Sequence, residues 1–195
     1  MVHKLTIALL LLLLALLAAC NSKRTTPKPR GYYRIALPFE RSYAPAPLGE
    51  SCPYTFEVSS LATVAPATDE HSEPFWVNVS YPAYNAKIHI SYKPLRGNLD
   101  RYIEDTHYLV YRHTVKADAI VQQRFAGEHG RSFGYLYEIG GNAASNVQFY
   151  LTDSARHFLR GSLYFNTHPN RDSLQPVIDY LTEDIMHLME TVRWK

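Results

Sequence analysis

The middle of the chain alternates between apolar and polar side chains. In the first such run, Tyr54, Phe56 and Val58 would face one side of a strand. Side chains of a β-strand point alternately to its two faces, so a period of two predicts half-buried strands. Strands that alternate this cleanly are typical of an antiparallel sheet with one face in water. The runs cover residues 54–58, 75–81, 88–92, 133–139, 147–151 and 159–165, with a weaker strand at 119–125.

Two other segments have the period of an amphipathic helix. The first begins at Asn98, a residue suited to an N-cap, and extends to about residue 116 with apolar positions three or four apart. The second closes the chain, where Asp172 and Gln175 resemble a capping box and Pro176 is tolerated near a helix start. Its apolar stripe consists of Leu174, Val177, Ile178, Leu181, Ile185, Leu188, Met189 and Val192.

The order of these elements predicts the fold class. Three strands, a helix, four strands and a final helix favour an α+β fold. We expect a mainly antiparallel sheet of about six to seven strands, with both amphipathic helices packed on its apolar face. The first 50 residues lie outside this pattern, because Pro27, Pro29, Pro38, Pro45 and Pro47 interrupt any regular element.

The first 19 residues have the composition of a signal peptide. Lys4 precedes an uncharged run over residues 5–19, which is short of the roughly 20 residues that a membrane-spanning helix needs. Leu17-Ala18-Ala19-Cys20 matches a lipoprotein cleavage box, so we expect cleavage before Cys20 and attachment of lipid to its thiol. An ordinary secreted protein and a single-span anchor are the alternatives. The predicted organisation is a signal peptide (1–19), a lipidated, proline-rich tether and arm (20–50), and one globular domain (51–195).

Charge adds little to this interpretation. Removal of residues 1–19 takes away one lysine and no acid, which leaves 19 basic and 18 acidic residues. A balance this even gives no reason to expect a nucleic-acid partner. The basic residues Lys23, Arg24, Lys28 and Arg30 come before the first acid, Glu40, and they fit either a solvated linker or contact with anionic lipid head groups.

The histidines and the remaining cysteine are the candidates for chemistry. Glu104 and His107, and likewise Asp184 and His187, have a spacing that can chelate a metal, but no third ligand accompanies them. Asp153, Ser154 and His157 have the residue types of a catalytic triad, yet they fall in an expected hairpin turn. We therefore expect no enzymatic activity, no metal and no cofactor. Cys52 has no partner once Cys20 is lipidated, so we expect a buried, reduced thiol.

A short uncharged segment between two predicted strands is the candidate partner contact. It consists of Gly140, Gly141, Asn142, Ala143, Ala144 and Ser145. Its glycines and asparagine suit an exposed hairpin connection. Six small residues would also let another backbone approach closely, so contact with an envelope protein is the second interpretation.

Several segments of the mature chain are similar to the GldD gliding-motility lipoproteins of Bacteroidetes. The most specific is GYLYEIGGNAASNVQFYLTDS (134–154), and others are TPKPRGYYRIALP (26–38), FWVNVSYP (75–82), KIHISYKPL (87–95), NLDRYIEDTHYLVYRHTVKADAI (98–120) and HFLRGSLYF (157–165). The resemblance implies an accessory role in gliding motility and the associated type IX secretion machinery. It also implies other envelope motility and secretion proteins as partners, and no catalytic or ligand residue beyond the lipidated Cys20.

The sequence also bears on the location of the protein and on an alternative function. Residues 21–30 contain no acid, unlike surface-export signals, which favours the periplasmic face of the outer membrane. The alternative function is a lipid-anchored periplasmic binding module or enzyme for an envelope ligand such as a glycan. The order of strands and the closing helix are similar to PsbP-like α+β sandwiches, a likeness of fold that says little about function.

Overall fold

The computed structural model describes residues 3, 6, 35–112, 117–127 and 131–195. The chain divides into two compact units, residues 1–33 and residues 34–195, and the fold below is that of the second unit. The predicted signal peptide, Cys20 and the tether up to residue 34 lie outside the described residues, apart from His3 and Thr6. No helix among the described residues is long and apolar enough to cross a bilayer.

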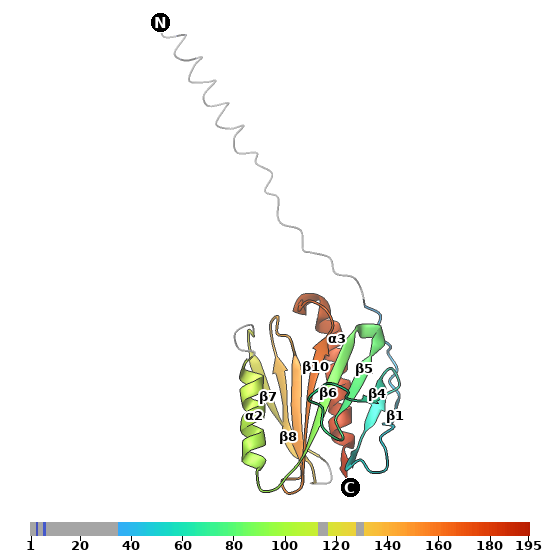
Figure 1. The fold of residues 1–195 in the computed structure, drawn as a ribbon. Helices are drawn as coiled ribbons and strands as arrows, with labels where there is room; N and C mark the ends of the chain where they lie inside the picture. Colours follow the sequence, from blue (N-terminus) through green and yellow to red (C-terminus); the bar gives the residue numbers. More distant parts are fainter. Residues whose placement is uncertain (1–2, 4–5, 7–34, 113–116, 128–130) are drawn as a thin grey trace. The chain divides into compact units, whose positions relative to one another are not determined.

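A seven-stranded antiparallel sheet forms the centre of the described domain (Figure 1). Its spatial order is β4-β5-β6-β10-β9-β8-β7, so the two long strands β6 and β10 pair in the middle. This confirms the predicted α+β class. The strands are β4 (Thr63–Pro66), β5 (Val77–Tyr81), β6 (Ala86–Pro94), β7 (Ile120–Ala126), β8 (Phe133–Ile139), β9 (Val147–Thr152) and β10 (His157–Phe165).

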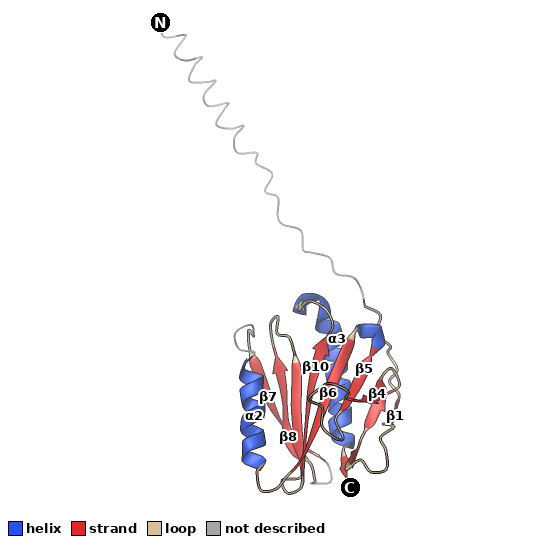
Figure 2. Cartoon of the chain, in the orientation of Figure 1, coloured by secondary structure: helices blue, strands red, loops and turns tan. Residues whose placement is uncertain are grey.

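The two helices cover opposite faces of the sheet (Figure 2). Helix α3 (Arg171–Thr191) contributes Leu181, Ile185 and Leu188 to the larger core. Helix α2 (Leu99–Tyr111) packs on a second cluster, where Tyr150 is 4% exposed. That cluster comprises Leu95, Val110, Tyr137, Ile139, Ala143, Tyr150 and Phe158. Our expectation that both helices share one face was wrong. Strands β8, β9 and β10 carry large apolar or aromatic side chains at both odd and even positions, so both faces of the sheet are apolar there.

The segment after Cys52 does not form one strand of the main sheet. It contains β2 (Tyr54–Thr55), which pairs with β11 (Arg193–Trp194), and β3 (Glu57–Ser59), which pairs with β1 (Tyr43–Pro45). The chain changes partner at Phe56, which is 1% exposed and whose carbonyl oxygen accepts a hydrogen bond from the Ala46 amide. A short 3-10 turn, η1 (Pro82–Tyr84), links β5 to β6.

The folded unit begins well before residue 51. Ile35, Leu37 and Leu48 pack against the larger core, and Ala46 is 7% exposed within it. The predicted boundary between arm and domain is thus about 17 residues too late, since the compact unit starts at Arg34. We call residues 35–48 the arm from here on.

The starts of the helices differ from the sequence-based expectation. Helix α3 has Asn170 at its N-cap position, and no side chain there accepts a capping hydrogen bond, so the predicted capping box at Asp172 is wrong. Asn142 takes over the role from a distant loop, because its side-chain oxygen accepts a hydrogen bond from the Arg171 amide at 3.0 Å. Helix α2 does begin after Asn98, but the described helix ends at Tyr111, and residues 113–116 lie outside the description.

Candidate functional site

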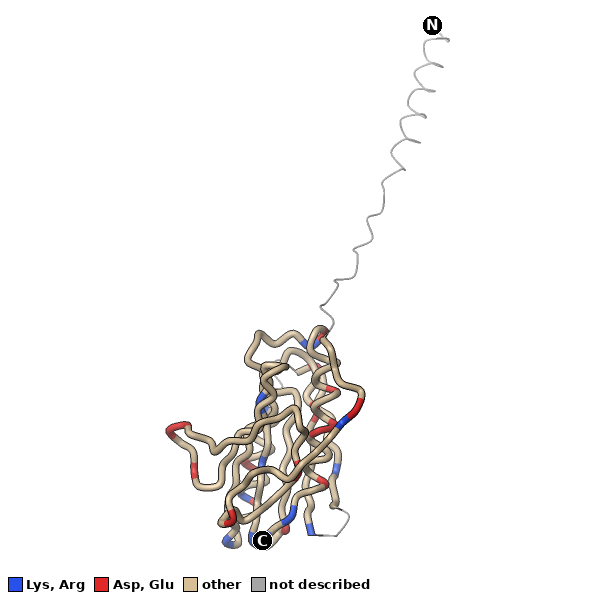
Figure 3. The backbone as a smooth tube through the Cα atoms, turned by 90° about the vertical axis from the view of Figure 1, so that its right-hand side faces the viewer, with Lys and Arg blue, Asp and Glu red and all other residues tan. Residues whose placement is uncertain are grey.

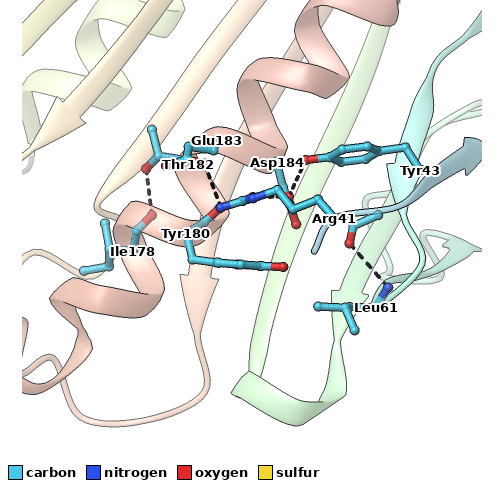
Figure 4. A network of polar contacts seen from close by, with 9 residues as sticks. Arg41, Tyr43, Leu61, Ile178, Tyr180, Thr182, Glu183 and Asp184 are labelled. Carbon is cyan, nitrogen blue, oxygen red and sulfur yellow. Dashed lines mark hydrogen bonds and ion pairs between the residues drawn. The ribbon is translucent and has the colours of Figure 1, made fainter. Parts of the chain in front are cut away.

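A polar network joins the arm to the buried side of helix α3 (Figure 4). Nη1 of Arg41 donates to Oδ1 of Asp184 at 2.5 Å and to the carbonyl oxygen of Tyr180 at 3.0 Å. Nη2 of Arg41 forms an ion pair with Glu183 at 2.8 Å. The guanidinium also lies over the Tyr180 ring, 3.8 Å from its centroid, which adds a cation–π contact. Arg41 therefore contacts three residues within about one turn of helix α3.

Asp184 is the centre of this network. Its side chain has no exposed surface, and Oδ1 also accepts a hydrogen bond from the hydroxyl of Tyr43 at 2.9 Å. Oδ2 is buried without a hydrogen-bond partner among the described residues. Burial and the charge of Asp184 raise the pKa of Tyr180, and the same two causes raise that of Tyr81. Both phenols stay protonated around the carboxylate.

The network extends from Tyr43 to the first small sheet. The Tyr43 ring stacks on His187 with 3.7 Å between centroids, and Nε2 of His187 lies 2.9 Å from Oε2 of Glu57 on β3. Asp184 and His187, whose spacing resembled half of a metal site, therefore serve contacts with the arm and β3. The described residues contain no group of three or more His, Cys, Asp or Glu side chains that could hold a metal ion.

The three residues whose types match a catalytic triad, Asp153, Ser154 and His157, lie in a turn. Oδ1 of Asp153 accepts hydrogen bonds from the amides of residues 155, 156 and 157. Burial opposes ionisation of Asp153, but these three donors lower its pKa overall. Nδ1 of His157 lies 2.8 Å from the Tyr92 hydroxyl, and its ring stacks on Trp194. Ser154 has a φ of 66° in the same turn, and the Nδ1 atom of His157 is hydrogen-bonded to Tyr92 and not to Ser154.

The remaining candidates for chemistry are Cys52, His107 and Glu104. Cys52 is a buried free cysteine in the described chain, as expected. His107 makes edge contacts with the rings of Tyr111 and Tyr137. Glu104 is exposed one turn before His107 on helix α2, and no third ligand joins them among the described residues.

The loop at 140–145 is largely buried. Ala143 is 2% exposed within the α2-side cluster, and Ser145 has no exposed surface, so the expectation of an exposed turn was wrong for both. The side-chain amide of Asn146 donates to the carbonyl oxygens of Ile139 and Gly141, which closes the connection internally. Gly140 and Gly141 are also buried, and Gly141 has a φ of 79°. Asn142 and Ala144 are the two exposed positions of the six.

Arg41 and Tyr43 could not be recognised from the sequence, because the prolines on both sides of them are typical of a tether. A usable pattern was present in helix α3, where Asp184 interrupts the apolar stripe between Leu181 and Leu188. A carboxylate on the buried face of a helix requires a partner. Charges of both signs are scattered over the part of the chain drawn in Figure 3, so charge alone does not identify that partner.

Three comparisons with known proteins complete the description. The sequence model of a family described as gliding motility lipoprotein GldD matches residues 22–194. No curated protein matches the chain. Among solved structures, the solution structure of cyanobacterial PsbP (CyanoP) from Synechocystis sp. PCC 6803 is similar, with a TM-score of 0.43 and 9% sequence identity over 87% of this chain and 99% of that chain.

Proposed function

This chain belongs to the GldD family of gliding motility lipoproteins, and from that premise we propose that it is a non-enzymatic assembly component of the gliding apparatus and the associated type IX secretion machinery. Membership in the family associates the chain with gliding motility and with a lipid-anchored position in the cell envelope. The observation that carries the proposal is the family match from residue 22 to residue 194, which spans the arm, the sheet and both helices.

The arrangement of ionisable groups supports a non-enzymatic role. The most deeply buried carboxylate, Asp184, is used to hold the arm, and Asp153 is used to hold a turn. Catalytic acids and bases need to reach a substrate, whereas these groups contact backbone amides, a guanidinium and a phenol. The chain uses its polar interactions to fix its own segments in place, as a component that presents a shaped surface to other proteins requires.

Anchoring through Cys20 is the first testable part of the proposal. We expect Cys20→Ala to abolish incorporation of labelled palmitate and to leave the signal peptide uncleaved, because the thiol that receives the lipid is gone. Unchanged palmitate labelling of the variant would exclude Cys20 as the acceptor.

A protease experiment tests the periplasmic placement. For the wild-type protein, protease added to intact cells should leave the chain whole while a surface protein is degraded.

Partner contact is the second testable part, and it depends on the exposed positions of the 140–145 loop. We expect affinity purification from crosslinked membranes, read by mass spectrometry, to recover envelope proteins of the motility and secretion machinery. Ala144→Arg adds bulk and charge at an exposed position, where the free energy of unfolding should change by less than about 0.5 kcal/mol. If the loop is part of the contact, this variant loses the partners and keeps its melting temperature.

The matched control for the loop is a residue on another surface. Arg101→Glu changes charge on the exposed side of helix α2, where the arginine side chain is 79% exposed, and should leave the partners bound. Retention of all partners by Ala144→Arg would show that the loop is only a connection. Recovery of envelope glycans without motility or secretion proteins would instead support the binding-module alternative.

A further inference from the structure

The two edges of the main sheet differ in how they are protected. Strand β4 at one edge has four residues and ends at Pro66, which cannot donate to a further strand. Strand β7 at the other edge has seven residues, Ile-Val-Gln-Gln-Arg-Phe-Ala, with one charge and no proline. Natural edge strands are usually shortened, charged or interrupted, because an open edge pairs with other chains. Strand β7 has none of these protections beyond Arg124.

The hydrogen bonds at the ends of β7 show which of its backbone groups face outward. The Gly140 amide donates to the Ala119 carbonyl oxygen, and the Gly127 amide donates to the Ser132 carbonyl oxygen. Bonded and non-bonded pairs alternate in an antiparallel ladder, so the odd-numbered residues of β7 bond to β8. The outward amides and carbonyls belong to Ile120, Gln122, Arg124 and Ala126.

Among the residues that the structure describes, none covers the middle of β7 on either face or at its edge. Val121 is 57% exposed on the α3 side of the sheet, although it is a large apolar residue. Gln122 and Arg124, on the α2 side, are also exposed, so helix α2 does not extend over this strand. A second strand could therefore approach without displacing a helix.

We propose that a second copy of this chain pairs with β7, antiparallel and about a two-fold axis at Gln123. In this register Gln122 lies opposite Arg124, and Val121 lies opposite Phe125. Gln123 faces its own copy, and two glutamine amides can hydrogen-bond to each other. The even-numbered residues, whose backbone groups point outward, then form the hydrogen-bonded pairs. The main sheet continues across both copies.

Self-complementarity is the reason to choose a second copy over an unrelated strand. Each Arg124 meets a neutral Gln122 whose side-chain oxygen can accept from the guanidinium, so no like charges face each other. Each apolar side chain meets an apolar one on the α3 side. An edge contact of this kind buries little area, so the dimer is a weak one. Confinement of both copies to one membrane surface raises their effective concentration.

Disulfide trapping in membranes tests the register. In Gln123→Cys the new thiol faces its own copy, with Cβ atoms about 5 Å apart, and we expect a reducible dimer on non-reducing gels of the mature, anchored protein. In the control, Val121→Cys, the two thiols lie about four residues apart along the strands, roughly 13 Å, which is too far to bond. Cys52 is present in both variants and is buried. Equal trapping at both positions would overturn the register.

A change of charge tests the pairing independently. On the Gln123→Cys background, Gln122→Lys places a cation opposite Arg124 at both symmetric positions, and we expect about a threefold or greater loss of dimer. Gln122→Glu should raise the yield of dimer instead. Trapping of the Gln123→Cys variant to a different protein would refute the second copy as occupant. Dimer yields that change with neither Gln122→Lys nor Gln122→Glu would refute it as well. Loss of the dimer with motility proteins still co-purifying would leave the proposed function standing.

Discussion

Replacing Arg41 with methionine is expected to lower the free energy of unfolding by about 3 kcal/mol, because it leaves the carboxylate of Asp184 buried without its cation. The Asp184 side chain has no exposed surface, while that of Arg41 is 20% exposed. Methionine keeps the aliphatic part of the side chain, so the loss reports the guanidinium, with its charge, its hydrogen bonds and its contact with the Tyr180 ring. Urea unfolding of the purified mature chain, followed by fluorescence of its two tryptophans, measures the change.

The neighbouring ion pair provides the control for this variant. Glu183 also contacts Arg41, but its side chain is 71% exposed, so Glu183→Gln should change the unfolding free energy by less than about 1 kcal/mol. Combining Arg41→Met with Asp184→Leu removes both buried charges and should recover most of the loss. A single Arg41→Met variant as stable as the wild type would contradict the view that Asp184 depends on the arm.

Gly134→Ala should cost about 3 kcal/mol or more, the second large effect. A Cβ atom on Gly134 would lie 1.8 Å from the carbonyl oxygen of Tyr150, and backbone cannot move aside as a flexible side chain can. Strand β8 would have to separate from β9 in the middle of the sheet. Thermal unfolding of the variant measures the loss as a drop in melting temperature.

A second glycine shows whether the effect is specific to that approach. At Gly49 the nearest atom to a built Cβ is Oγ of Ser51 at 3.9 Å, so Gly49→Ala should be nearly neutral, within about 0.5 kcal/mol. A Gly134→Ala variant that melts with the wild type would mean that β8 and β9 can spread at this point without loss.

Elements with a strongly periodic pattern of apolar residues could be predicted from the sequence, whereas the elements that they pack against could not. Alternation located β6, β8, β9 and β10, and the helical period located α2 and α3, since each pattern repeats over several residues. Strand β4 was missed because Thr63–Pro66 is too short to show a period. The face that each helix covers depends on contacts between residues far apart in sequence, so Tyr150 gave no indication that α2 would cover it.

The candidate site was hidden for a related reason. Arg41 and Tyr43 lie 143 and 141 residues from Asp184, and the prolines around them indicated an extended tether. The 140–145 loop was misjudged because small, uncharged residues suit a buried connection as well as an exposed one. The chelating spacings lacked a third ligand, and the triad-like residues fell in an expected turn. The structure uses several of these residues in contacts with the arm and in a turn.

The placement of Arg41 ahead of β1 has a mechanical consequence. Tension applied through the N-terminal side of the arm first meets the packing of Ile35 and Leu37 on the larger core, next the Arg41 contacts with helix α3, and then the short β1–β3 ladder, whose bonds can open one after another. These contacts open before extension of the chain reaches the seven-stranded sheet. Peeling of the arm, residues 35–48, would lengthen the connection by up to about 45 Å while the sheet stays folded. The arm is therefore the part of the domain that such a load would extend first, and the Arg41 contacts with helix α3 add to its resistance.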